Sequence, residues 1–346
     1  MLRRRLAGIL TGALVIALAS PTAVAAQPVN TAAEPARFRY CTEYTNPPTG
    51  VVRLAGSDRY QTAIAVSQLR FAELQACEVF VASGRTFPDA LTAAANSSFG
   101  PLLLIPGDSL PPSVRTEIQR LDPSAIVSFG GSAVITPSVK EQLANLVGGV
   151  LVMNNGANRF DTAKVASADN TPGRTTYIAT GADYPDALAA VPLIRRTYGS
   201  FLLVSRTGIP SETQQALGWL RPSNIVIIGG SGSVSEGVAQ SLRSFTTGSV
   251  TRIEGIDRYQ TAVRISEQDP FTGGGGAVVI VSGRSFADAL SASTLDIGPV
   301  LLVEPDSIPS VVRDRLQEMR PDTIFIVGGP ASVSQGVEMD LEQYLR

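Results

Sequence analysis

The sequence contains no histidine among its 346 residues. A Ser-His-Asp or Cys-His catalytic arrangement and a zinc centre with histidine ligands are therefore excluded. Lysine occurs only as Lys140 and Lys164, so arginine supplies nearly all of the basic residues. The 28 basic and 30 acidic residues nearly balance, which leaves no basic excess of the kind that nucleic-acid binding requires. With 44% hydrophobic and 17% charged residues, the composition is that of a folded chain rather than a disordered one.

The first residues have the pattern of a secretory signal. Arg3, Arg4 and Arg5 precede an apolar stretch from Leu6 to Ala19, and small residues follow at 23–26. We expect residues 1–26 to be removed as a signal peptide and residues 27–50 to form an N-terminal arm. A permanent membrane helix is the alternative, although the apolar stretch is short for a full span. The sequence thus predicts an exported protein with no stable membrane span after signal removal.

Cysteine is equally scarce, with Cys41 in the arm and Cys77 before an apolar segment. In an oxidising exterior an isolated pair usually forms a disulfide, so we predict a Cys41–Cys77 bridge. The separation of the two Cα atoms decides whether that bridge can form. No Walker sequence, dinucleotide fingerprint or metal-ligand spacing occurs, and we expect neither a cofactor nor a metal.

Four landmarks occur three times in the same order, which indicates internal repeats. They are a Gly-x-Asp/Asn-Arg-Tyr/Phe-x-Thr-Ala box at 56–63, 156–163 and 255–262, an Asp-Ala-Leu helix start at 89–91, 186–188 and 288–290, an apolar strand at 101–104, 200–203 and 299–302, and a Gly-Gly turn at 130–131, 229–230 and 328–329. We infer three homologous modules, at 51–148, 149–248 and 249–346.

Short apolar runs alternate with helical patterns in each module. In the first, the pattern predicts strands at 51–55, 78–83, 102–105 and 125–129, separated by helices from 59, 88 and 112 and followed by a last helix from 137. This alternation predicts an α/β fold with a small parallel sheet in each module. Because the linkers are short, we expect the modules to close into a pseudo-threefold ring, with an open chain of beads as the alternative.

Ligands of open α/β sheets collect outside the carboxyl ends of the strands. Arginines that suit phosphate or carboxylate groups fall at such positions, namely Arg59, Arg85, Arg258 and Arg284. A structural role is the alternative, because Arg59, Arg159 and Arg258 could instead pair with acids between modules. For Arg159 and for the helix-start carboxylates Asp89, Asp186 and Asp288 we favour a structural role.

Taken together and in triplicate, these landmarks resemble the cell wall-binding repeat 2 family of secreted bacterial proteins. The resemblance implies three Rossmann-like modules packed as an intramolecular trimer, localised at the cell wall or cell surface and bound to an anionic wall polymer. The family's polymer-binding Pro-Ile-Leu-Leu element matches Pro101, Leu102, Leu103 and Leu104 in the first module and Pro299, Leu301 and Leu302 in the third. The second module has Ser200-Phe201 there and no arginine after Gly181, which puts its binding in doubt.

The resemblance therefore favours non-covalent binding to an anionic wall polymer by a protein that is not an enzyme. A scaffold that recruits another secreted wall protein, such as an amidase, is the alternative. A hidden enzyme is a third hypothesis, which the missing histidine and the missing metal spacing both disfavour.

Overall fold

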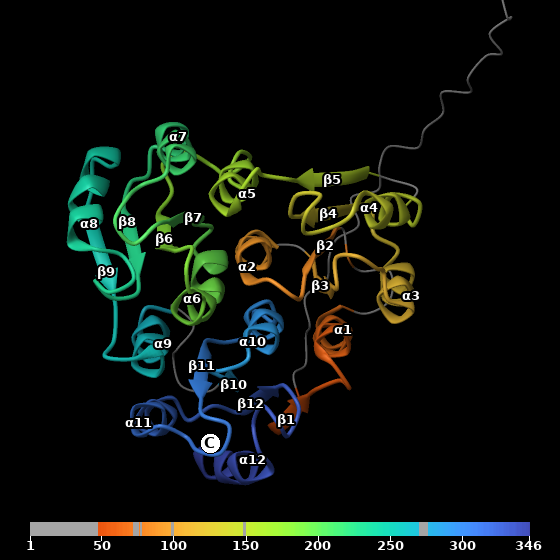
Figure 1. Ribbon diagram of the computed structural model, residues 1–346. Coiled ribbons are helices and arrows are strands. Elements are labelled where there is room, and N and C mark those ends of the chain that lie inside the picture. The colour runs from red at the N-terminus through yellow and green to blue at the C-terminus, as the bar shows by residue number, and fades with distance from the viewer. Residues whose placement is uncertain (1–47, 72–75, 77, 98–99, 148–149, 270–275) are drawn as a thin grey trace, which may run out of the picture. The chain divides into compact units, whose positions relative to one another are not determined.

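Three small parallel sheets surround three inner helices in the computed structural model (Figure 1). The structure describes residues 48–71, 76, 78–97, 100–147, 150–269 and 276–346. The predicted signal peptide and both cysteines of the predicted disulfide lie outside these residues. All three repeats belong to one compact unit.

The elements follow the same order in each repeat. The first repeat contains β1 (Gly50–Leu54), α1 (Arg59–Arg70), β2 (Glu78–Ser83), α2 (Phe87–Asn96), β3 (Leu102–Ile105), α3 (Pro112–Leu121), β4 (Ala125–Phe129) and α4 (Pro137–Ala144). The second contains β5 (Val150–Asn154), α5 (Arg159–Ala166), β6 (Thr176–Thr180), α6 (Pro185–Arg196), β7 (Ser200–Val204), α7 (Ser211–Leu220), β8 (Ile225–Ile228), α8 (Glu236–Leu242) and the short 3₁₀ helix η1 (Arg243–Phe245). The third contains β9 (Val250–Ile253), α9 (Arg258–Glu267), β10 (Ala277–Ser282), α10 (Phe286–Ser293), β11 (Val300–Val303), α11 (Ser310–Met319), β12 (Thr323–Val327), α12 (Gln335–Leu341) and η2 (Glu342–Tyr344).

The strand that opens each repeat is exchanged into the sheet of the repeat before it. The strand orders are β3-β2-β4-β5, β7-β6-β8-β9 and β11-β10-β12-β1, and every pairing is parallel. The module boundaries predicted from the sequence place each opening strand in the sheet of its own module, and the observed exchange corrects that prediction. Because β1 pairs with β12 near the other end of the chain, the exchange closes the three repeats into a ring.

The inner helices α2, α6 and α10 each contact the other two. Their sequences explain how they come so close: α2 reads FPDALTAAAN, and Ala90, Ala93 and Ala94 are fully buried. A helix with small, apolar side chains on every face packs in the interior rather than at the surface. One hydrophobic cluster accordingly includes Leu91, Leu188 and equivalents from all three repeats. The predicted α/β fold with three modules in a pseudo-threefold arrangement is confirmed.

The inner helices differ at their carboxyl ends. Helix α6 has 12 residues, whereas α2 has 10 and α10 has 8, and the last turn of α6 carries Arg195 and Arg196. Arg195 donates to Ser97 Oγ of the first repeat at 3.0 Å and faces Asp296 of the third repeat at 3.5 Å. Arg70 and Arg196 each approach the same Asp296 carboxylate at 3.4 Å. This asymmetric charge cluster joins all three repeats where the negative ends of the helix dipoles meet.

Within the described ranges, no helix is both long enough and apolar enough to cross a bilayer.

Candidate functional site

The repeated box forms the turn between an exchanged strand and the helix that follows it. Asp58 Oδ1 accepts hydrogen bonds from the N–H groups of Tyr60 and Gln61, and Asn158 caps its helix in the same way. Asp257 caps its helix through one such bond, from the N–H group of Gln260. The box threonine accepts from the box glycine, as Thr62 Oγ1 does from Gly56 N at 3.1 Å. A Cβ atom on Gly56 would lie 2.1 Å from Gln61 Cβ, so only glycine fits there. The box is therefore a helix N-cap that also crosses between repeats.

Each box arginine binds a glycine carbonyl of its own repeat, and two of the three also contact an aromatic ring of an adjacent repeat. Arg59 Nη1 donates to the carbonyl oxygen of Gly84 at 2.6 Å, and Arg258 does the same to Gly283 at 2.6 Å. Arg59 also lies 5.4 Å from the ring centre of Phe286, which belongs to the third repeat. Cation–π contacts of this kind stabilise by about 1 kcal/mol when partly desolvated.

Three aromatic side chains at the amino ends of the inner helices meet between these arginines. The rings of Phe87 and Tyr184 lie 5.5 Å apart, and those of Tyr184 and Phe286 lie 5.9 Å apart. Arg159, which donates to the carbonyl oxygen of Gly181, lies 5.9 Å from the Phe87 ring. This cluster was not among the predicted features, although the sequence carries a signal for it: an aromatic residue stands two positions before the helix-start aspartate in every repeat.

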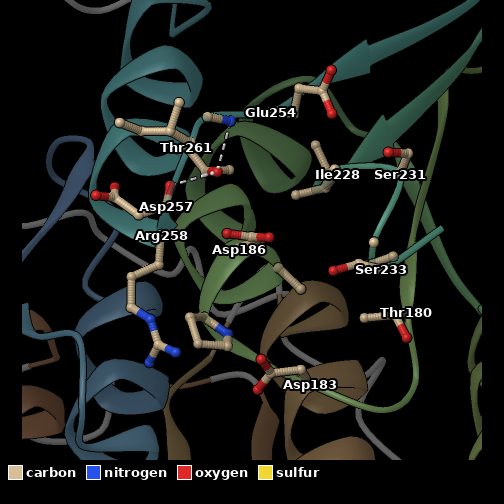
Figure 2. A pocket seen from close by; sticks show the side chains of 17 residues that line it. Thr180, Asp183, Asp186, Ile228, Ser231, Ser233, Glu254, Asp257, Arg258 and Thr261 are labelled. Carbon is tan, nitrogen blue, oxygen red and sulfur yellow. Dashed lines mark hydrogen bonds between the residues drawn. The ribbon is translucent and has the colours of Figure 1, made fainter.

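A cavity of about 410 Å³ lies where the second repeat meets the box of the third. It opens at the carboxyl ends of β6 and β8, which is where open α/β sheets place their ligands. Figure 2 shows Asp186 and Glu254 facing this space, while the Arg258 side chain extends away from them. Acidic side chains outnumber basic ones among the described residues that line it, which include Asp183, Asp186, Glu254, Asp257 and Arg258.

The helix-start carboxylates Asp89 and Asp288 are buried at these junctions, and Asp186 is half-buried. Burial raises the pKa of Asp186, and the charges of Asp183 and Asp257 act in the same direction. Burial also raises the pKa of Asp89, against the lowering effects of Thr162 and Arg159. Asp288 instead accepts hydrogen bonds from Ser285 at 2.8 Å and Ser332 at 2.7 Å. Within the described ranges, no group of three or more acidic or cysteine side chains could hold a metal ion.

The other predicted polymer-binding residues fall into two sets. Arg85 and Arg284 are exposed and form ion pairs, Arg85 with Asp108 at 2.6 Å and Arg284 with Glu304 at 2.7 Å. The apolar elements are buried in strands β3 and β11 or directly before them, namely Pro101, Leu102, Leu103 and Leu104 in the first repeat and Pro299, Leu301 and Leu302 in the third. The leucines therefore shape the sheet beneath the surface, and Arg85 and Arg284 are the members of this group that face solvent.

The chain belongs to the cell wall binding domain 2 (CWB2) family, whose model matches residues 53–140, 154–239 and 252–338. This finding confirms the resemblance on which the sequence analysis relied. CWB2 repeats are cell wall binding domains, and the chain is accordingly associated with the cell wall.

Two curated relatives come from Bacillus subtilis (strain 168). The N-acetylmuramoyl-L-alanine amidase LytC is 27% identical over 299 residues, which are 84% of this chain and 58% of LytC. A protein named amidase enhancer is 31% identical over 192 residues, which are 54% of this chain and 26% of that protein. The chain thus spans little more than half of one relative and about a quarter of the other.

Two solved structures share the fold. Cwp6 from Clostridium difficile has a TM-score of 0.78 at 22% identity, covering 86% of this chain and 48% of Cwp6. Cwp8 from the same organism has a TM-score of 0.77 at 20% identity, covering 86% of this chain and 52% of Cwp8. At these identities the likeness shows the three-repeat fold.

Proposed function

We propose that this chain binds the bacterial cell wall non-covalently through an anionic secondary wall polymer and does so without catalysis. The observation that carries the proposal is the threefold match to a cell wall binding domain. The closed ring supports it as well, because the box residues of all three repeats are engaged in caps and contacts between repeats rather than in a nucleophile–base arrangement.

The charges favour one part of the surface for the polymer. The cavity at the second repeat is lined by four carboxylates and one arginine, so it repels a polyanion. Arg85 and Arg284 keep 57% and 68% of their side chains exposed. Their guanidinium groups can exchange Asp108 and Glu304 for phosphate or carboxylate groups of a polymer. We therefore assign the anionic contact to the first and third repeats.

Sedimentation with purified walls tests the function directly. The chain should pellet with walls, remain soluble after acid extraction of the secondary polymers, and be released by the free extracted polymer. Pelleting that is unaffected by the extraction would contradict polymer binding.

The double variant R85A/R284A tests the site. It should reduce the pelleted fraction at low salt and have less effect at high salt, because screening already weakens these contacts. Stability should change by no more than about 0.5 kcal/mol, since both side chains are exposed. The matched control R206A/R243A removes two other exposed arginines and leaves the net charge the same as in the test variant. Equal loss of binding in both variants would indicate a bulk charge effect instead of a site.

Recruitment of another wall protein is the second candidate function, favoured by the likeness to an amidase enhancer. A wall amidase from the same source should then co-purify with the chain in the absence of wall material. Pelleting with walls that requires such a partner would favour recruitment over direct polymer binding.

A further inference from the structure

Each Gly-Gly turn receives a cation on the carbonyl oxygen of its first glycine. In two sheets the cation is an arginine of the exchanged strand: Arg53 donates to Gly328 O at 2.8 Å and Arg252 to Gly229 O at 2.8 Å. The register places Met153 at the equivalent position of β5, and Met153 is 52% exposed. The exchanged strand β5 therefore lacks the arginine that holds β1 and β9.

A lysine from helix α4 takes over that contact. Lys140 Nζ donates to Gly130 O at 3.0 Å and, at the same distance, to Oδ1 of the Asn155 side chain. Ala239 and Glu338 stand at the position of Lys140 in the other repeats, and Glu254 and Ala55 stand at the position of Asn155. The lysine–asparagine pair is thus specific to the junction between the first and second repeats.

A buried carboxyl group lies beside this pair. Asp89 is 8% exposed, as is Lys140, and Asp89 Oδ1 has no hydrogen-bond partner. Its other oxygen lies 3.2 Å from the place where a Cβ atom of Gly130 would stand, so Asp89 and Lys140 flank the same glycine. Burial raises the pKa of Asp89 and lowers the pKa of Lys140, which favours the neutral forms of both groups.

We propose that Lys140 and Asn155 react to form an intramolecular isopeptide bond, with Asp89 as the proton carrier. Asp89 first takes a proton from the Lys140 ammonium group, which leaves a neutral amine. Lys140 Nζ then attacks Asn155 Cγ, a new C–N bond forms, and the bond from Cγ to Nδ2 breaks. The proton lost by the attacking amine and the proton returned by Asp89 leave with Nδ2 as an ammonium ion, so Asp89 is again a carboxylate and the chain has lost the mass of one ammonia molecule. One amide replaces another, and no oxidant or reductant is needed.

The surroundings suit each step. A desolvated lysine is a competent nucleophile, whereas the guanidinium group of arginine stays protonated. This difference gives a reason for lysine at position 140 in a chain that otherwise relies on arginine. The Asn155 side chain is exposed, so the ammonia departs directly into solvent. The bond would fasten helix α4 to the turn that follows β5, the exchanged strand without an arginine.

Intact-mass measurement of the full secreted chain, denatured and reduced, tests the proposal. The mass should be lower than that of the processed sequence by one ammonia molecule. Tandem mass spectrometry of a digest should show one branched peptide in which Lys140 is joined to Asn155. Two separate, unlinked peptides containing these residues would overturn the proposal.

Variants distinguish this bond from other sources of ammonia loss. K140R keeps the positive charge, and N155A removes only an exposed amide, so each should restore the mass by abolishing the bond. K164R is the matched control and should retain the loss. Succinimide formation at Asn155–Gly156 and cyclisation of an N-terminal glutamine also release ammonia, but neither needs Lys140. Ammonia loss that persists in full in K140R would therefore refute the isopeptide bond, and circular dichroism of both variants shows that they are folded.

Discussion

At the scale of single residues, the molecule is distinguished by charges buried between repeats. Asp296 is the shared partner of three arginines that approach it from two other elements, and its side chain is 17% exposed. Removing one charged group from a buried ionic cluster leaves the remaining charges without a partner. The loss of folding stability is then far larger than when a surface ion pair is removed. The contribution of Asp296 to stability should accordingly exceed that of any exposed carboxylate.

The variant D296N should therefore be strongly destabilised. Arg195, whose side chain is 1% exposed, would lose its carboxylate partner and keep Ser97. We expect the free energy of unfolding to fall by about 3–5 kcal/mol, measured by urea denaturation. The control D306N removes an exposed carboxylate and should change stability by about 0.5 kcal/mol or less. Equal effects of the two substitutions would show that the cluster contributes nothing.

The raised pKa of Asp186 predicts a pH dependence of stability. The folded protein holds this proton to a higher pH than the unfolded chain does, because burial disfavours the carboxylate. This contribution to stability is complete below the unfolded pKa and is lost as the pH rises through the folded pKa. D186N removes it, so the stability of D186N relative to the parent should rise between pH 4 and pH 7. Urea midpoints at several pH values measure the difference, and the exposed Asp340, changed to asparagine, serves as control. A relative stability that falls over this range would contradict the assignment.

At the scale of elements, local sequence was sufficient to locate most strands and helices. The predicted strands at 78–83, 102–105 and 125–129 match β2, β3 and β4, because each is an unbroken apolar run between turn residues. The partner of the opening strand was not predictable in the same way. The strand pairs with β12, and its contacts come from residues far along the chain, such as Glu338, which binds Arg53 at 2.8 Å.

In the candidate site, too, features set by local sequence were predictable, whereas contacts between distant residues were not. The helix that begins at Arg59 was predicted from its local pattern, and the cap that Asp58 supplies is local as well. The aromatic partner of this arginine was not predicted, because Phe286 lies in the third repeat, far along the chain from Arg59. The aromatic residue before each helix-start aspartate is visible in every repeat, but its ring partners are not, because the cluster forms only when three repeats meet.

In the first sheet a lysine on helix α4 replaces the arginine that the exchanged strand supplies in the other two sheets. Introducing the same arrangement into the second sheet tests whether the two residues are equivalent. In the second sheet Arg252 donates to the carbonyl oxygens of Gly229 and Val234. R252M, which copies Met153, should leave these acceptors unpaired and cost about 1–3 kcal/mol. Adding A239K, which copies Lys140, should restore part of this loss. Thermal unfolding of the two variants measures the recovery, and a double variant no more stable than R252M would show that a lysine on the helix does not replace the arginine on the strand.

At the scale of the whole molecule, the pairing of β1 with β12 makes a linear chain into a closed ring. Two of the three exchanged strands, β5 and β9, follow the last helical segment of the preceding repeat after a short connection. The third junction has no such covalent connection, since β1 begins the described chain and η2 lies near its end. At this junction the ring is closed by the parallel pairing of β1 with β12, from Gly50 opposite Thr323 to Leu54 opposite Val327, and by the contacts of Arg53.

A circular permutant tests whether that pairing closes the ring. The chain would begin at Ala55, and residues 48–54 would follow Arg346 through a short linker, copying the connection between the other repeats. This permutant should unfold in one cooperative transition, because β1 can still pair with β12 and Arg53 can still reach Gly328. The matched chain that begins at Ala55 and omits residues 48–54 should be several kcal/mol less stable, since each lost hydrogen bond contributes about 1 kcal/mol. Its exposed β12 edge should also promote association between molecules, which light scattering detects. Equal stability of the two chains would mean that the inner helices alone hold the three repeats together.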